Sequence, residues 1–153
     1  MDGGKIGPDG GRKMTEKRIV VIFTGGTIAM GLDPRTGGAV PLLSGEDLMS
    51  GMPDLKGLAR IRIVNFCNKP GPHLQLEDIC ELGKTVGRLF EQDQADGIVI
   101  THGTDTLEET AYGLDLLLAG DRPVIVTGAM RSSAQIGADG PANLFQSILA
   151  AAD

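Results

Sequence analysis

Hydrophobic residues in this chain fall into short continuous runs and into longer stretches where they recur every three or four positions. The short runs are rich in β-branched residues, and they lie at residues 18–23, 60–66, 97–101 and 123–127. Runs of this length and composition predict strands that are buried on both faces of a parallel sheet. The run at 60–66 alternates with arginines, so we expect one end of that strand to be more exposed.

The longer stretches predict helices. Residues 76–90 carry apolar side chains at helical spacing, which predicts an amphipathic helix of about four turns. A second amphipathic helix is expected over residues 107–118, where Thr106 and Glu109 form the capping-box pattern that opens it. A last helix is expected to begin near Pro141, because proline suits the first turn of a helix.

The segment between the first two strands has local signals of its own. Residues 30–43 contain prolines and a glycine pair without a hydrophobic period, which predicts a long loop with hairpin character. Long loops in compact domains are often functional lids. Residues 44–52 predict a short helix, with Ser44 as its N-cap and Asp47 as the capping-box partner.

Strands and helices alternate along the chain, and this order predicts an α/β fold. We expect a mostly parallel, doubly wound sheet with helices on both faces, joined by right-handed crossovers. Residues 1–17 are rich in glycine and charge, which predicts a disordered N-terminal tail, and residues 18–153 form one domain. No glycine cap or closing strand follows the last helix, so we interpret the chain as cut within that helix.

Composition excludes several classes of function. A formal net charge of −6 and five aromatic residues (four Phe, one Tyr) argue against a direct nucleic-acid partner. Cys67 and Cys80 lack the number and spacing of a disulfide framework or a zinc site, so we expect buried small hydrophobes, no metal and a cytoplasmic protein. No apolar stretch is long enough for a signal sequence or a membrane span, so no membrane partner is expected.

Polar residues gather directly after three of the predicted strands: TGGT at 24–27, THGTD at 101–105 and GAMR at 128–131. Ligands of open α/β sheets bind at the carboxyl ends of the strands, so these loops are a candidate reaction centre. A threonine hydroxyl becomes a nucleophile once a base takes its proton, and a reacting carbonyl needs donors near its oxygen. Spacing alone also leaves a structural reading open, in which the threonines only cap helices and turns.

Three motifs carry a resemblance to a known family. They are TGGTIA at 24–29, THGTDTLEETA at 101–111, and GAMR followed by ADGPANL at 138–144. In them the sequence resembles the bacterial-type asparaginase/glutaminase family over residues 18–153. The resemblance implies the N-terminal domain of an amidohydrolase, without its C-terminal domain. It further implies hydrolysis of L-asparagine, or also L-glutamine, through a threonine nucleophile and an acyl-enzyme, no cofactor, and a homo-oligomeric full-length form.

The resemblance also implies roles for individual residues. Thr27 is the expected nucleophile, Thr104 the second catalytic hydroxyl, and Asp105 the carboxylate that holds the α-ammonium of the substrate. Ala129 is expected to offer its backbone carbonyl to the carboxamide of the substrate. Gly26 and Gly103 are expected to line the substrate site.

The chain departs from the family pattern at several places. Residues 30–43 contain no tyrosine, whereas the family has one there that assists the nucleophile. The serine that grips the α-carboxylate is missing, and either Asn68 or Gly71 stands in its place. The catalytic lysine of the family lies on a later segment that this chain does not contain. General acid–base assistance contributes about 10²–10⁴-fold, so we expect little turnover by this chain alone.

Other readings remain open at this stage. A related amidotransferase subunit, which feeds ammonia to a tRNA-linked reaction, would share these motifs. A non-catalytic module could instead hold a small anion with Gly25, Gly26 and Gly103. His102 is either a catalytic helper or a residue that packs the turn, Arg131 an anchor for its loop or a functional group, and Asp139 a cap for the last helix.

Overall fold

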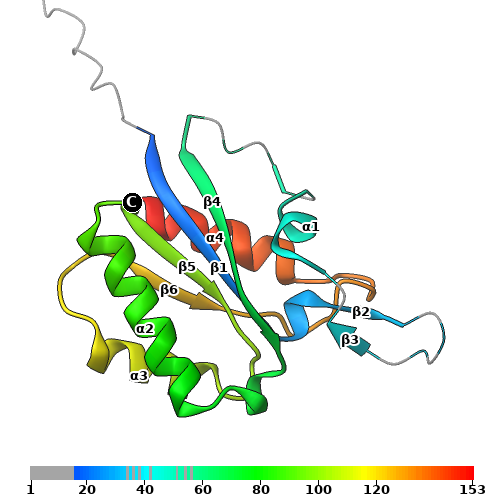
Figure 1. The fold of residues 1–153 in the computed structure, drawn as a ribbon. Coiled ribbons are helices and arrows are strands. Elements are labelled where there is room, and N and C mark those ends of the chain that lie inside the picture. The colour runs from blue at the N-terminus through cyan, green and yellow to red at the C-terminus, as the bar shows by residue number, and fades with distance from the viewer. Residues whose placement is uncertain are drawn as a thin grey trace, which may run out of the picture.

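Four parallel strands form the central sheet of the computed structural model, which describes residues 16–33, 35, 37, 39–41, 43–50, 52–53, 55 and 57–153. In sheet order they are β4 (Ala59–Lys69), β1 (Lys17–Gly25), β5 (Gly97–Thr101) and β6 (Val124–Thr127) (Figure 1). Residues 1–15 of the predicted tail lie outside the described residues, whereas Lys17, its last residue, belongs to β1 and pairs with Ala59. The four expected strands are confirmed.

Helices cover both faces of this sheet, as the alternation of elements predicts. On one face α2 (Leu76–Glu91) and α3 (Leu107–Leu117) pack over Val20 and Ile22 of β1. On the other face α1 (Gly45–Ser50) and α4 (Gly140–Ala152) pack over Ile19 and Val21 (Figure 1). Neighbouring residues of β1 thus enter opposite cores, which explains why its hydrophobic run is continuous.

A separate antiparallel hairpin rises from the carboxyl end of β1. The chain leaves β1 through the 3₁₀-helix η1 (Thr27–Ala29) and continues into β2 (Met30–Leu32) and β3 (Ala39–Pro41), which pair with each other. The N–H of Leu43 donates to the carbonyl of Ala29 at 3.0 Å and closes the base of the hairpin. The prediction of hairpin character is confirmed.

The predicted helix starts fare differently. The Ser44 and Asp47 capping box of α1 is present, with the N–H of Asp47 donating to Ser44 Oγ and the N–H of Ser44 donating to Asp47 Oδ2. The helix predicted over residues 107–118 is present as α3, but its predicted capping box is wrong, because Thr106 stands at the N-cap and its side chain caps no N–H group. A capping box that the sequence analysis missed opens α2 and joins Gln75 to Asp78.

Pro141 lies in the first turn of α4, as predicted, but the predicted cap by Asp139 is wrong. The Asp139 carboxylate makes no cap hydrogen bond because it accepts the N–H groups of Met130 and Arg131 instead. These donors are distant in sequence, so a local cap pattern could not reveal the competition.

The cysteines are free thiols, and both are only partly buried, so the expectation of buried cysteines is wrong. Cys67 Sγ donates to the carbonyl of Thr24 at 3.1 Å, and burial raises the pKa of this thiol. Within the described residues there is no cluster of three or more His, Cys, Asp or Glu side chains arranged for a metal ion. Within the same part of the chain, none of the helices combines the length and the apolar character of a membrane span.

An ion-pair cluster joins the amino ends of β1 and β5, at the sheet edge opposite the candidate site. Arg18 Nη2 lies 2.6 Å from Asp96 Oδ1 and 3.0 Å from Asp93 Oδ1, and the N–H of Arg18 donates to Asp96 Oδ2 at 2.7 Å. The side-chain hydrogen bonds from Arg18 lower the pKa of Asp96 to about 2. Because Asp96 also donates its N–H to the carbonyl of Arg18, the pair fixes the relative register of the two strands.

We predict that Asp96→Asn lowers the free energy of unfolding at pH 7 by about 1 kcal/mol, since the pair is partly screened by solvent. The folded-state pKa lies below the ordinary value of about 3.9. The stabilisation is therefore complete above pH ~4 and is lost as the pH falls toward 2. Urea unfolding of both proteins across this range measures the effect, with Asp115→Asn on the surface of α3 as the control. A difference between wild type and Asp96→Asn that does not shrink at low pH contradicts this assignment.

Candidate functional site

The three polar loops meet at the carboxyl ends of β1, β5 and β6, where their glycines bring the backbones into contact. A Cβ atom placed on Gly26 would lie 2.4 Å from the N atom of Gly103, and one on Gly103 would lie 2.7 Å from the N atom of Gly71. A Cβ on Gly128 would lie 2.7 Å from the carbonyl oxygen of His102. No larger residue fits at these contacts, so the glycines place the loops side by side.

The turn before η1 is shaped by left-handed glycines. Gly26 has φ +78° and Gly25 has φ +110°, a region that residues with a side chain rarely adopt. The N–H of Gly26 donates to the carbonyl of Lys69 at 3.2 Å, so it is not available to an anion. The N–H groups of Thr27 and Ile28 begin the short helix and have no partner inside it.

The candidate hydroxyls and the carboxylate lie on two neighbouring loops. Thr27 is the first residue of η1 and is partly exposed, as is Thr104. Asp105 follows Thr104 in the turn that leads into α3, and it is exposed. Each threonine comes directly after a glycine of the Gly26–Gly103 contact, so the structure brings these predicted site residues together.

The third loop carries Ala129, which is buried, with 1% of its surface exposed. Asn143 Nδ2 donates to the carbonyl of Gly128 at 3.0 Å, and Asp139 accepts the N–H of Met130 at 3.0 Å and of Arg131 at 2.8 Å. These backbone donors hold the pKa of Asp139 below its usual range. Arg131 Nη1 donates to the carbonyl of Gly137 at 3.1 Å, which agrees with the first of its two readings, an anchor of the loop.

Asn68 and Gly71, the two candidates for the α-carboxylate, occupy different surroundings. Asn68 is exposed at the end of β4 and lines a cavity of about 280 Å³, together with Gly25, Ser44 and Cys67. Gly71 is buried in the 3₁₀-helix η2 (Gly71–His73), against Gly103. Of the two, only Asn68 offers a side chain to a ligand that approaches from solvent.

His102 packs the turn between β5 and α3. Its ring is fully buried, with Nδ1 2.8 Å from the carbonyl oxygen of Gly103 and Nε2 2.9 Å from Thr110 Oγ1. A carbonyl only accepts, so Nδ1 carries a proton and donates to Gly103, and Nε2 pairs with the Thr110 hydroxyl. Both nitrogens are engaged in structural hydrogen bonds, which supports the packing role over a catalytic one.

Sequence reasoning missed Lys69, which contacts the site through its main chain. Its carbonyl accepts the N–H of Gly26, while its Nζ lies 2.7 Å from Asp78 Oδ2. The Gln75 N–H and the Lys69 ammonium lower the pKa of Asp78, and the carboxylate raises that of Lys69. The pair links the end of β4 to the start of α2. The sequence signal for this ion pair was a lysine at the end of one strand followed by acidic residues in the first turn of the next helix.

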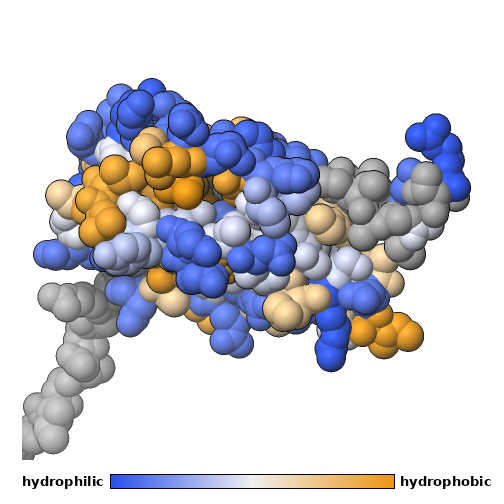
Figure 2. Space-filling view, turned by 90° about the horizontal axis from the view of Figure 1, so that it is seen from below, coloured by the Kyte–Doolittle hydropathy of each residue, from blue (hydrophilic) through white to orange (hydrophobic). Residues whose placement is uncertain are grey.

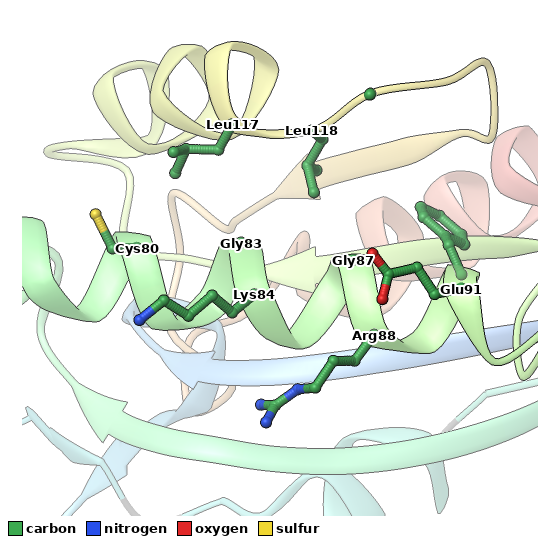
Figure 3. Close-up of a pocket in the computed structure, with 10 residues that line it drawn as sticks. Cys80, Gly83, Lys84, Gly87, Arg88, Glu91, Leu117 and Leu118 are labelled. Atoms are coloured by element: carbon green, nitrogen blue, oxygen red, sulfur yellow. The ribbon is translucent and has the colours of Figure 1, made fainter.

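A larger groove, of about 650 Å³, lies away from these loops, between α2 and α3. Leu117 and Leu118 reach from the end of α3 toward α2, where Gly83 and Gly87 leave room (Figure 3). Hydrophobic residues gather on this face beside a hydrophilic band (Figure 2). None of the three polar loops lines the groove, so its size does not make it the reaction centre.

Comparison with known proteins adds an independent line of support. The sequence model "Asparaginase, N-terminal" matches residues 18–153. The chain is 40% identical over 141 residues to a glutaminase-asparaginase of Pseudomonas aeruginosa, an alignment that covers 88% of this chain and 38% of that protein. It is 39% identical over 145 residues to L-asparaginase 2 of Escherichia coli, covering 94% of this chain and 41% of that protein.

A solved structure shows the same fold. The crystal structure of a probable cytoplasmic L-asparaginase from Campylobacter jejuni superposes with a TM-score of 0.80 at 37% sequence identity. The match covers 90% of this chain and 40% of that one. The chain therefore spans about two fifths of the length of the proteins that it matches.

We predict that Gly26→Ala destabilises the protein more than Gly57→Ala does. Both glycines have positive φ, +78° and +84°, so each substitution carries a conformational cost of about 1–2 kcal/mol. At Gly57 no atom lies within 4 Å of the added Cβ, whereas at Gly26 the methyl group meets the backbone of Gly103, which adds about 1–3 kcal/mol. Urea denaturation measures the difference, and equal destabilisation of the two variants would show that the close contact is absent.

Proposed function

This chain belongs to the asparaginase family through its match to the N-terminal domain, and we propose that it carries the nucleophile half of an amidohydrolase site. The reaction is the hydrolysis of L-asparagine to L-aspartate and ammonia, with L-glutamine as a second substrate. The observation that supports it best is the contact between Gly26 and Gly103, which sets Thr27 and Thr104 on adjoining loops.

The proposed reaction begins at Thr27. Its Oγ attacks the side-chain carbonyl carbon of asparagine, and the N–H groups of Thr27 and Ile28 at the start of η1 face the developing oxyanion. The tetrahedral intermediate collapses as the amide nitrogen takes up the proton that Thr27 lost and leaves as ammonia, so that an aspartyl ester remains on Thr27. Water, oriented by the Thr104 hydroxyl, then attacks this ester, returns one proton to Thr27 Oγ and releases aspartate.

Recognition of the substrate falls to the polar groups around the two threonines. The exposed carboxylate of Asp105 pairs with the α-ammonium of asparagine. Asn68 takes the α-carboxylate, because its side chain reaches solvent at the end of β4 whereas Gly71 is buried. Ala129 supplies its carbonyl to the carboxamide.

Two groups of the family pattern that assist proton transfer are not among these 153 residues. The tyrosine that assists the nucleophile is missing from residues 30–43, and the lysine that pairs with the second threonine lies on a later segment. General acid–base help contributes about 10²–10⁴-fold to such reactions, so we propose slow turnover by these 153 residues alone. No observation favours an amidotransferase subunit or an anion-binding module. We place the protein in the cytoplasm, where the name of the Campylobacter jejuni protein also places that enzyme.

The first test is release of ammonia from L-asparagine by the purified chain. We predict that Thr27→Ala abolishes the residual release and also the covalent aspartyl adduct that mass spectrometry of acid-quenched samples detects. Thr85→Ala on α2 is the matched control and keeps both. Release that persists unchanged in Thr27→Ala excludes Thr27 as the nucleophile.

A second test concerns Asp105. We predict that Asp105→Asn weakens binding of L-asparagine by about tenfold or more, because a charge-assisted pair with the ammonium is lost. Succinamate has the same carboxamide and carboxylate but no ammonium, so its binding is expected to change little. Calorimetry with both ligands measures this, and Asp121→Asn, at another exposed aspartate, serves as the control. Equal weakening of both ligands contradicts the ammonium assignment.

A further inference from the structure

The turn at residues 128–131 contacts one of the loops that carry the candidate hydroxyls directly and the other through the start of α4. A Cβ on Gly128 would lie 3.2 Å from Cγ2 of Thr104. A Cβ on Gly140, the first residue of α4, would lie 2.8 Å from Cγ1 of Ile28, the residue after Thr27, and 3.6 Å from Cβ of Ala129. The position of this turn therefore depends on both threonine loops, and any group that holds the turn also sets its register with them.

Two side chains near the start of α4 fix the peptide groups on both sides of Ala129. Asn143 Nδ2 donates to the carbonyl of Gly128 at 3.0 Å. Asp139 Oδ2 accepts the N–H of Met130 at 3.0 Å, and Oδ1 accepts the N–H of Arg131 at 2.8 Å. Asn143 Nδ2 also donates to Asp139 Oδ2 at 3.0 Å, so the two side chains form one hydrogen-bonded unit.

The carbonyl oxygen of Ala129 accepts no hydrogen bond from Asp139 or Asn143. Ala129 is 1% exposed, and between residues that the structure describes no hydrogen bond ends on its carbonyl oxygen. Buried backbone carbonyls are nearly always paired, because an unpaired one loses its bonds to water without replacement. An unpaired acceptor held in place by side chains on both sides is suited to an N–H donor that arrives with a ligand.

We propose that Asp139 and Asn143 are positioning residues, which hold the turn so that the Ala129 carbonyl stays unpaired and receives the carboxamide N–H of the substrate. This inference rests on the proposed amide-hydrolysing function. Neither side chain touches the substrate; both act through the peptide groups of residues 128–131. The backbone donors keep the pKa of Asp139 low, so the carboxylate remains an acceptor at neutral pH.

A pair of ligands isolates the N–H group. L-Asparagine and the β-methyl ester of L-aspartate share the α-ammonium, the α-carboxylate and a side-chain carbonyl, but the ester has no N–H to donate. Affinities for both are measured by calorimetry in a Thr27→Ala background, which prevents turnover. Asp139→Asn keeps the size of the side chain and turns an NH₂ group toward backbone N–H donors, so it disrupts the turn locally.

The expected result is that Asp139→Asn weakens binding of asparagine by about tenfold and binding of the ester by less than about twofold. Asp121→Asn leaves both affinities unchanged. Equal weakening of the two ligands, or no weakening of either, overturns the proposal, because a general loss of structure does not distinguish an amide from an ester. If circular dichroism shows that Asp139→Asn does not fold, Asn143→Leu removes the donor to Gly128 and is judged by the same ratio.

A ligand-free measurement separates this inference from the proposed function. If the Thr27→Ala protein binds neither ligand, the proposed function fails. Amide hydrogen exchange at Met130 and Arg131 then tests the positioning on the wild-type chain. Faster exchange at both amides in Asp139→Asn supports a turn that the carboxylate holds, and unchanged exchange overturns it.

Discussion

Close contact between glycine backbones at the carboxyl edge of the sheet is the constraint on which the rest of the site depends. Gly26, Gly103 and Gly71 approach one another so closely that a Cβ on any of them would meet main-chain atoms. Thr27 and Thr104 each follow one of these glycines, so the contact places the two hydroxyl-bearing residues on adjoining loops. The sheet supplies the framework for this contact, because β4, β1 and β5 are adjacent and parallel, so their carboxyl ends lie at the same edge.

Much of the fold follows from hydrophobic pattern alone. Neighbouring residues of β1, such as Val20 and Val21, enter opposite cores. Both must therefore be apolar, which is why the strand is a continuous apolar run in the sequence. Helix starts were harder to predict, since a cap pattern describes only local partners. Asp139 has the sequence position of a cap, but backbone donors eight and nine residues earlier compete for its carboxylate. Tertiary contacts of that kind depend on the fold and cannot be read from spacing.

The candidate site shows the same division. The glycine and threonine positions are visible in the sequence, and the structure brings them to one edge. The sequence does not reveal which N–H groups beside Thr27 are paired, and in the structure the N–H of Gly26 donates to the carbonyl of Lys69. That bond depends on the register between β1 and the end of β4, where the pairing shifts between Phe23 and Gly25. The first N–H groups of η1, those of Thr27 and Ile28, have no partner inside that short helix.

The central claim is that the loops around Thr27, Thr104 and Ala129 form a single amino-acid site. Nuclear magnetic resonance titration of the chain with L-aspartate, the proposed product, tests it most directly because binding requires no turnover. The account predicts that amide shifts concentrate in residues 26–28, 103–105 and 128–131 and saturate with one common dissociation constant. Shifts confined to the groove between α2 and α3, or separate constants for the three loops, would contradict it.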